Sequence, residues 1–294
     1  WDVLGMRAPR SDSLLLDECV LDEHAARKSR IPALVAEVDS ALRALRAPAA
    51  RLIAQGGPAV IFEKPLLANG APSAMPVIVN LFGTVKRVAM GVTMGGKDRA
   101  TGADLREVGE LLAQLRQPQP PRSFGEATEL LPLVKTILAM KPKTVGKPAC
   151  QEIVLRGDDI DLSKLPVQTC WPGEPAPLIT WPLIVTQGPD PKGDKQDSFN
   201  LGIYRLQVTG KNTTLMRWLK HRGGAQHHQR WKGAGKREPL PVAAVIGADP
   251  GTILAAVTPV PDTLSEYQFA GLLRGKKVEL VNCKTVPLKV PAEA

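Results

Sequence analysis

The sequence contains few aromatic residues, few cysteines and no long apolar run. Aromatic side chains make up 4% of the 294 residues, and the four cysteines, Cys19, Cys150, Cys170 and Cys283, form no Cys-x-x-Cys pair. Without paired ligand spacing a structural zinc site is not expected, and free thiols in a reducing cytoplasm are the expected state. No stretch approaches the roughly 18 apolar residues of a membrane-spanning helix, and the first residues lack the order of a signal peptide. The composition therefore indicates a cytoplasmic protein.

Two other signatures are missing. Gly56-Gly-Pro58 and Gly95-Gly96 do not have the spacing of a phosphate-binding glycine loop. The formal net charge is +9, but no recognition-helix, zinc-finger or stacking-sheet pattern accompanies it, so nucleic-acid binding is not expected. A basic surface is instead expected to allow loose, peripheral association with anionic lipid.

The apolar pattern predicts an α+β chain long enough for two domains. Short strands are predicted at 59–62 and 75–82, followed by a helix over 104–115. From residue 151 onward, short β-type runs separated by Gly, Pro and Asp dominate, which is typical of a barrel or sandwich. These runs are Ile153–Leu155, Leu183–Thr186, Tyr204–Val208, Val242–Ile246 and Val278–Val281.

Residues 200–266 carry the residue types with the clearest chemistry. Asn200-Leu-Gly-Ile-Tyr-Arg205 is followed by Met216-Arg-Trp-Leu-Lys-His-Arg-Gly-Gly224 and then by Glu266. Amide and carboxylate oxygens suit hard divalent cations, arginines bind phosphate with a planar fork of donors, and glycines let backbone N–H groups approach it. This set suits a phosphorylated cofactor held through a metal ion.

Each of these residues has a simpler interpretation when taken singly. Asn200 can be a turn residue before Gly202, and Glu266 can be a solvated carboxylate at a helix start. The His227-His228 pair lies in a polar stretch and is predicted to be loop surface. The tryptophans are predicted to be core residues, with only Trp218 kept as a backbone-level cofactor contact.

Several ordered motifs together resemble the UbiD family of prenylated-FMN-dependent decarboxylases. Over roughly residues 52–294 the sequence is most similar to its branch that acts on 3-octaprenyl-4-hydroxybenzoate in ubiquinone biosynthesis. The motifs that carry the resemblance, besides those of residues 200–266, are Asn80-Leu-Phe-Gly-Thr84, Lys86-Arg-Val-Ala-Met-Gly91, Leu105-Arg-Glu-Val-Gly109, Thr169-Cys-Trp-Pro172, Pro177-Leu-Ile-Thr-Trp181, Gly247-Ala-Asp-Pro250 and Phe269-Ala-Gly-Leu-Leu-Arg-Gly275.

The resemblance implies a domain order. A divergent segment (1–50) is expected to precede an N-terminal α/β domain (51–140) and a split β-barrel that binds flavin (141–294). The family's acidic pair would follow the Val290-Pro-Ala segment, whereas this sequence stops at Ala294. We therefore expect a C-terminally truncated chain with an incomplete barrel and without the C-terminal domain.

The resemblance also implies site residues. Asn200 and Glu266 are expected to bind Mn²⁺, with K⁺ as a further candidate ion. Arg205 is expected to hold the substrate carboxylate within an acidic network. The residues expected to line prenylated FMN are Ile203, Tyr204, Arg205, Arg217, Trp218, Leu219, Arg222 and Gly223. Another branch of the family places a third, histidine ligand where this chain has Gly223, which leaves the coordination sphere open.

The implied activity is decarboxylation of a 4-hydroxy-3-polyprenylbenzoate to a 2-polyprenylphenol. The implied partners are this substrate, a flavin prenyltransferase that supplies the cofactor and further copies of the chain, with attachment peripheral to the inner membrane. Two alternatives remain. The chain can be a fragment that binds flavin and metal without turnover, or it can act on another phenolic or unsaturated acid.

Overall fold

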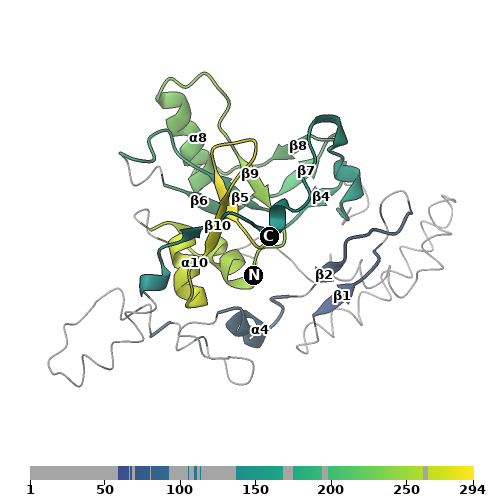
Figure 1. Ribbon diagram of the computed structural model, residues 1–294, viewed down its shortest axis with the longest axis horizontal. Helices are drawn as coiled ribbons and strands as arrows, with labels where there is room; N and C mark the ends of the chain where they lie inside the picture. The colour runs from purple at the N-terminus through teal and green to yellow at the C-terminus, as the bar shows by residue number, and fades with distance from the viewer. Residues whose placement is uncertain are drawn as a thin grey trace. The chain divides into compact units, whose positions relative to one another are not determined.

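The computed structural model describes residues 59–65, 67, 70–79, 81–92, 105, 109–110, 113, 137–167, 175–193, 198–260 and 264–294. In this part the chain forms small sheets and short helices (Figure 1), which group into two compact units. The first unit comprises Trp1–Arg87, Leu155–Thr180 and Arg205–Met216. The second comprises Val88–Val154, Trp181–Tyr204 and Arg217–Ala294. The helix predicted over 104–115 lies largely outside the described residues.

The first unit contains two small antiparallel sheets. In one, β1 (Val60–Phe62) pairs with β2 (Val77–Val79), which confirms the two strands predicted in this region. In the other, β7 lies between β4 and β8. The bounds of its strands are Leu178–Ile179 for β4, Leu206–Val208 for β7 and Thr214–Met216 for β8.

The second unit is built on the most deeply buried strand of the described chain. All four residues of β5 (Leu183–Thr186) are buried, with Leu183 and Ile184 at 1% and 0% exposure. β6 (Asn200–Ile203) and β9 (Ala243–Val245) pair antiparallel with its two edges. A continuous apolar run is the pattern expected of a strand covered on both faces, and the predicted strand is confirmed at its bounds.

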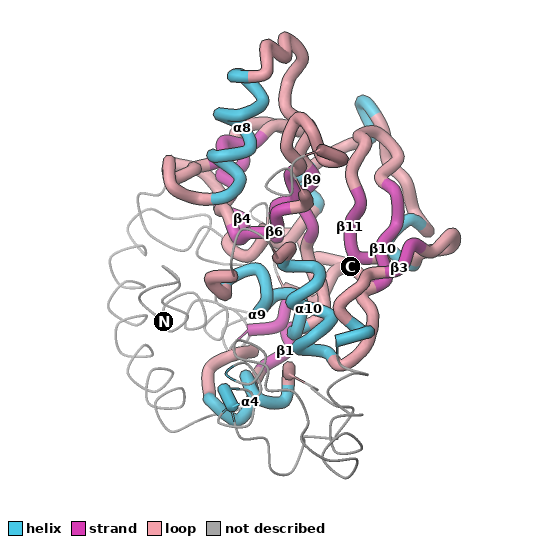
Figure 2. The backbone as a smooth tube through the Cα atoms, turned by 90° about the vertical axis from the view of Figure 1, so that its left-hand side faces the viewer, coloured by secondary structure: helices cyan, strands magenta, loops and turns pink. Residues whose placement is uncertain are grey.

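A second sheet of this unit lies near the C-terminus of the chain. β10 (Glu279–Asn282) pairs antiparallel with β11 (Lys289–Pro291) and parallel with β3 (Lys143–Thr144), as Figure 2 shows. Cys150 and Cys283 flank this sheet as free thiols, and burial raises the pKa of both. The predicted free thiols are confirmed for these two residues.

The described part of the second unit also contains helices between the strands, at positions where no strand was predicted. They are α8 (Gly223–Gly233), α9 (Pro250–Val257) and α10 (Glu266–Arg274); a fourth, short helix is α4 (Val85–Met90). None of the helices in the described ranges is both long and apolar enough to cross a membrane.

Local sequence signals explain the bounds of α9 and α10. Asp249 caps α9 by accepting the Thr252 N–H at 2.8 Å, and the proline after it suits the first helical position. Ser265 and Gln268 form a capping box at the start of α10, and Gly275 ends it in the left-handed conformation at φ 62°.

The strand predicted at Ile153–Leu155 is wrong. These residues form no strand, and Ile153 is 80% exposed. The neighbouring segments are short 3-10 helices, at Ala149–Gln151 and Gly157–Asp159, and the run pairs with no strand among the described residues. The observed fold is mixed α and β with separate small sheets; the split barrel stays a prediction.

Arg274 joins two parts of the second unit through paired charges. Its side chain is 7% exposed, with Nε 2.5 Å from Asp249 Oδ2 and Nη1 2.9 Å from Glu293 Oε1. Because Asp249 also caps α9, the guanidinium connects the end of α10 to the start of α9 and to the segment after β11.

We predict that Arg274→Met lowers the free energy of unfolding by about 2–3 kcal/mol, because it leaves two carboxylates without their shared cation; partial exposure of both carboxylates limits the loss. Urea denaturation measures this decrease in the free energy of unfolding. Glu238→Gln is the control, since its pair with Lys236 is long (3.8 Å) and exposed. Equal losses in both variants would contradict a stabilising role for Arg274.

Candidate functional site

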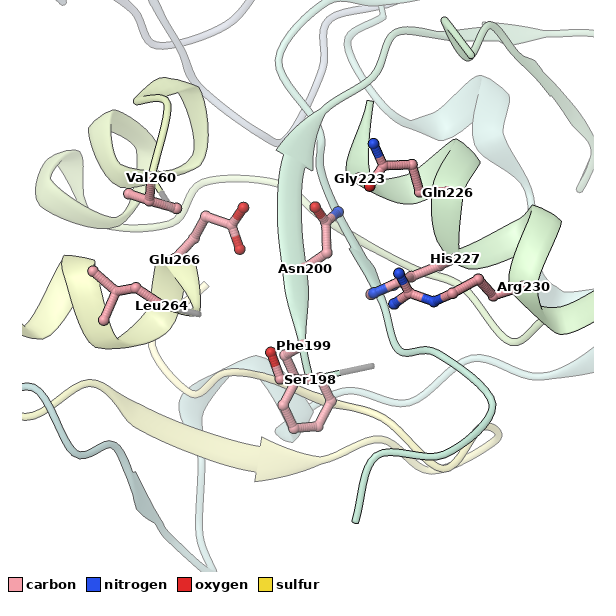
Figure 3. A pocket seen from close by; sticks show the side chains of 10 residues that line it. All are labelled: Ser198, Phe199, Asn200, Gly223, Gln226, His227, Arg230, Val260, Leu264 and Glu266. Carbon is pink, nitrogen blue, oxygen red and sulfur yellow. The ribbon is translucent and has the colours of Figure 1, made fainter. Parts of the chain in front are cut away.

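A polar cavity lies in the second unit among β6, α8 and the start of α10. In Figure 3, Asn200 of β6 stands between Glu266 of α10 and the side chains of α8. The residues that line the cavity are Ser198, Phe199, Asn200, Gly223, Gln226, His227, Arg230, Val260, Leu264 and Glu266. The structure therefore brings together both predicted metal ligands and Gly223.

Asn200 has an unsatisfied amide in this cavity. Its Nδ2 atom is buried and has no hydrogen-bond partner within the described part of the chain. A Cβ atom built on Gly223 would lie 1.9 Å from Asn200 Oδ1, so only glycine allows the first turn of α8 to approach the amide. A buried donor without an acceptor is costly in a native protein, and an anion bound in the cavity would satisfy it.

Glu266 is held next to Asn200 by the backbone. It is the first residue of α10, and its Oε2 accepts a hydrogen bond of 3.0 Å from the Leu201 N–H. Because Leu201 follows Asn200 in β6, this bond places the carboxylate beside the amide. The helix N-terminus also favours a negative charge at this position.

His227 is not on a surface loop, so that prediction is wrong. It lies in α8, is 3% exposed, and its Nδ1 is 2.9 Å from the hydroxyl of Thr186 on β5. Helix formation over 223–233 turns one face of this polar stretch toward the sheet. His228, half-buried, packs its ring 5.8 Å from Trp218 instead.

Sequence reasoning also missed Gln226 and Arg230 as cavity residues. A signal was present, because Gly223, Gln226, His227 and Arg230 follow the i, i+3, i+4, i+7 spacing of one helix face. Apolar periodicity does not detect this face, since most of its members are polar.

Tyr204, Trp218 and Gly224 support the start of α8. The Tyr204 hydroxyl accepts a 3.1 Å hydrogen bond from the Gly224 N–H, and the two aromatic rings meet edge to face at 6.0 Å. A Cβ atom on Gly224 would lie 3.2 Å from both rings. The aromatic pair therefore fixes the backbone of the glycine pair that borders the cavity.

The remaining predicted cofactor residues do not line the cavity. Arg205, Arg217, Leu219 and Arg222 are exposed, and Ile203 is half-buried at the end of β6.

Tyr267 anchors the segment behind Glu266. It is 1% exposed, and its hydroxyl donates a 2.9 Å hydrogen bond to the Lys289 carbonyl. Burial, reinforced by the charges of Cys283 and Glu266, raises the pKa of Tyr267 well above its usual range. The phenol therefore stays protonated and keeps donating at any physiological pH.

The described residues contain no group of three or more His, Cys, Asp or Glu side chains that could hold a metal. A cation in the cavity would therefore use the Asn200 amide oxygen together with the Glu266 carboxylate. Such a mixture of donors fits Mn²⁺ or Mg²⁺. The fold and site thus define a mixed α and β protein with a partly enclosed polar site whose donors suit a cation and an anion.

The chain belongs to the UbiD family. The model of the 3-octaprenyl-4-hydroxybenzoate carboxy-lyase Rift-related domain matches residues 143–294, and that of the N-terminal domain matches residues 35–112. The enzymes of this family and the similar solved structures are decarboxylases.

Solved structures agree with this assignment. The vanillic acid decarboxylase of Sedimentibacter hydroxybenzoicus in closed form is 25% identical, with a TM-score of 0.63 over 84% of this chain and 47% of its own. The UbiD-class enzyme HmfF of Pelotomaculum thermopropionicum, in complex with FMN, is 26% identical, with a TM-score of 0.56 over 76% and 42%. An evolved dimeric form of HmfF is in complex with prFMN. The chain spans less than half the length of these relatives.

We predict that Gly223→Ala lowers the free energy of unfolding by about 1–3 kcal/mol, because the new methyl group collides with the Asn200 side chain in a packed site. Thermal unfolding followed by circular dichroism measures it.

Gly233→Ala is the matched control at the other end of the same helix, where a new Cβ meets nothing within 4 Å. Its stability should stay unchanged or rise by less than about 1 kcal/mol. A Gly223→Ala protein as stable as this control would show that Asn200 is not tightly packed.

Proposed function

We propose that the chain is the cofactor-binding part of a prenylated-FMN-dependent decarboxylase, and that its cavity holds a divalent cation, Mn²⁺, against the cofactor phosphate. The observation that carries this proposal is the arrangement of Asn200, Gly223 and Glu266. A carboxylate fixed by the backbone, an amide oxygen and a glycine with no room for a side chain share one cavity, and the amide Nδ2 still needs an acceptor such as a phosphate oxygen.

The charges of the cavity support a cation and an anion together. Arg230 and Glu266 carry opposite formal charges among the lining residues. A divalent cation adds two positive charges to a partly enclosed site, which is unfavourable unless an anion accompanies it. A phosphate dianion beside the cation restores neutrality, and the Arg230 guanidinium suits its oxygens. Cation and phosphate should therefore strengthen each other's binding.

The other residues predicted from the family resemblance keep their proposed roles. Ile203, Tyr204 and Trp218 contact the flavin, and Arg205 orients the substrate carboxylate. Four further residues line the cofactor: Arg217, Leu219, Arg222 and Gly223. We also propose that the chain divides into domains at residues 50 and 140, and that residues 141–294 belong to a split β-barrel.

The proposed reaction is decarboxylation of a 4-hydroxy-3-polyprenylbenzoate, because both matching family models carry the description of such a carboxy-lyase. When bound, the prenylated flavin supplies an electrophilic ring system that takes up the electron pair left by departing carbon dioxide. The chain's own residues bind the phosphate, orient the acid and exclude water. A smaller phenolic acid is the second candidate, since a similar solved structure is a vanillic acid decarboxylase.

The proposed partners follow from the same family membership. A flavin prenyltransferase supplies the cofactor, and copies of the chain associate, as the dimeric HmfF form illustrates for that relative. A polyprenyl substrate favours attachment at the surface of the inner membrane, with the protein on the cytoplasmic side.

We predict that Glu266→Gln weakens Mn²⁺ binding by about tenfold to a hundredfold, because it removes the anionic ligand but keeps the shape of the side chain. Isothermal titration with Mn²⁺, with and without FMN, measures the Kd. In the unsubstituted chain FMN should tighten Mn²⁺ binding, and in Glu266→Gln this coupling should disappear.

Co-expression with a flavin prenyltransferase gives a second measurement, the flavin absorbance of the purified protein. Glu238→Gln is the matched control, because Glu238 is exposed and does not line the cavity. Mn²⁺ affinity and flavin content that are the same in both variants would refute the proposed site.

A further inference from the structure

We propose that one surface of the second unit docks on an anionic lipid bilayer, with exposed apolar side chains that enter the headgroup region beside lysines. The inference deepens the membrane attachment of the proposed function, on which it rests, by naming the surface that carries it. This docking surface comprises the exposed residues Ile137, Leu138, Lys141, Lys143, Lys276 and Lys277.

The lysines gather at one end of the sheet that contains β3 and β10. The two strands pair in parallel, and Lys143 lies beside Glu279. Because the segments run in the same direction, Lys141 and Lys277, each two residues earlier, lie at the same end of the sheet. The hydrogen bond from Lys143 lowers the pKa of Glu279, and nearby positive charges, including that of Lys276, lower it further. All four lysines therefore surround one short stretch of β10.

Few carboxylates in the described ranges offset these four lysines. Glu279 lies 2.7 Å from Lys143 Nζ and neutralises that one charge. Asp249 and Glu293, which lie near the end of α10, are both paired with Arg274, whose side chain is 7% exposed. The docking surface thus keeps an excess of positive charge, which the negative potential of an anionic bilayer attracts.

The apolar members of the docking surface lie directly before the lysines in the chain. Residues 137–139 form a helical turn in which Leu138 is 64% exposed and Ile137 is 42% exposed, while Ala139 is buried at 5%. A Cβ atom on Gly271 would collide with the Ala139 carbonyl oxygen, so the turn packs tightly against α10. The fold therefore holds two large apolar side chains in solvent at a fixed place next to the lysines.

The combination of the two features favours a membrane over other partners. Single exposed apolar side chains are common on protein surfaces, and lysines alone attract any polyanion. Leucine and isoleucine beside lysines are the pattern of an interfacial anchor, because the apolar groups bury at the boundary of headgroups and acyl chains while the ammonium groups bind anionic headgroups. The same bilayer would hold the polyprenyl tail of the proposed substrate.

Vesicle flotation tests the docking surface with the full chain. The chain should bind mixed vesicles of phosphatidylcholine and phosphatidylglycerol at least about tenfold more tightly than vesicles of phosphatidylcholine alone, and added salt should release it. This comparison needs no substitution, so folding of a variant does not limit it. A chain that does not bind the mixed vesicles, or that binds both kinds equally, overturns the inference.

Paired substitutions locate the contribution of charge. Lys276→Gln combined with Lys277→Gln should weaken binding to the mixed vesicles by about tenfold to thirtyfold, because each lysine near an anionic surface contributes roughly a fivefold factor. Lys192→Gln combined with Lys232→Gln is the matched control, since it removes the same charge from exposed lysines after β5 and on α8. Equal losses in both double variants would reduce the effect to net charge and overturn the assignment of this surface.

A second pair of variants tests insertion. Leu138→Ser should weaken binding to the mixed vesicles by about threefold to tenfold, because a partly inserted leucine gains part of the free energy of full burial. Leu215→Ser is the matched control, since Leu215 is equally exposed, at 64%, but lies on β8.

Two outcomes of this second pair would contradict the bilayer as partner. If Leu138→Ser binds like its control while the lysine variant does not, the lysines attract anions without insertion, and the bilayer assignment is overturned. If the chain leaves vesicles unbound and is instead a dimer in size-exclusion chromatography that Leu138→Ser makes monomeric, the surface joins copies of the chain, and the inference is overturned as well.

Titration with Mn²⁺ and FMN separates this inference from the proposed cofactor site. The double variant at Lys276 and Lys277 should keep both affinities, because neither residue lines the cavity. A chain that binds Mn²⁺ and FMN but no vesicles keeps the cofactor site and refutes the docking surface. A chain that binds mixed vesicles through this surface but neither Mn²⁺ nor FMN refutes the cofactor site alone.

Discussion

The hydrogen bond from the Leu201 N–H to the Glu266 carboxylate joins strand β6 to the start of helix α10, and the geometry of the cavity depends on it. A backbone donor cannot change rotamer, so the carboxylate is fixed beside Asn200 as long as the strand remains paired. The partner strand β5 is buried along its whole length and brings Thr186 opposite Asn200. The polar site is thus rigid because it is built directly on the apolar core.

The sequence predicts the core of this fold better than its periphery. Leu183–Thr186 was predicted at its observed bounds because burial on both faces demands a continuous apolar run. Ile153–Leu155 has similar composition but pairs with no strand in the described part of the chain, and pairing across the chain is not a local property. Helix α9 was not predicted although its cap, Asp249, is present in the sequence, and for α10, which Ser265 caps, only a helix start at Glu266 was considered.

Among the site residues too, those marked by local sequence motifs were predicted, and those that depend on contacts between distant segments were missed. Asn200 and Glu266 were predicted from family motifs, and the structure brings them into one cavity, while their metal-binding role stays a proposal. His227 was missed because polar composition suggested a loop, whereas a polar helix face becomes visible only when the sheet that it covers is known. Arg230 was missed for the same reason.

The contact between Gly223 and Asn200 has an evolutionary consequence. A side chain at position 223 requires the asparagine to retreat, so a substitution there is deleterious unless a second change in β6 accompanies it. The effects of substitutions at positions 223 and 200 on stability should therefore be non-additive, because the two residues share one packed contact.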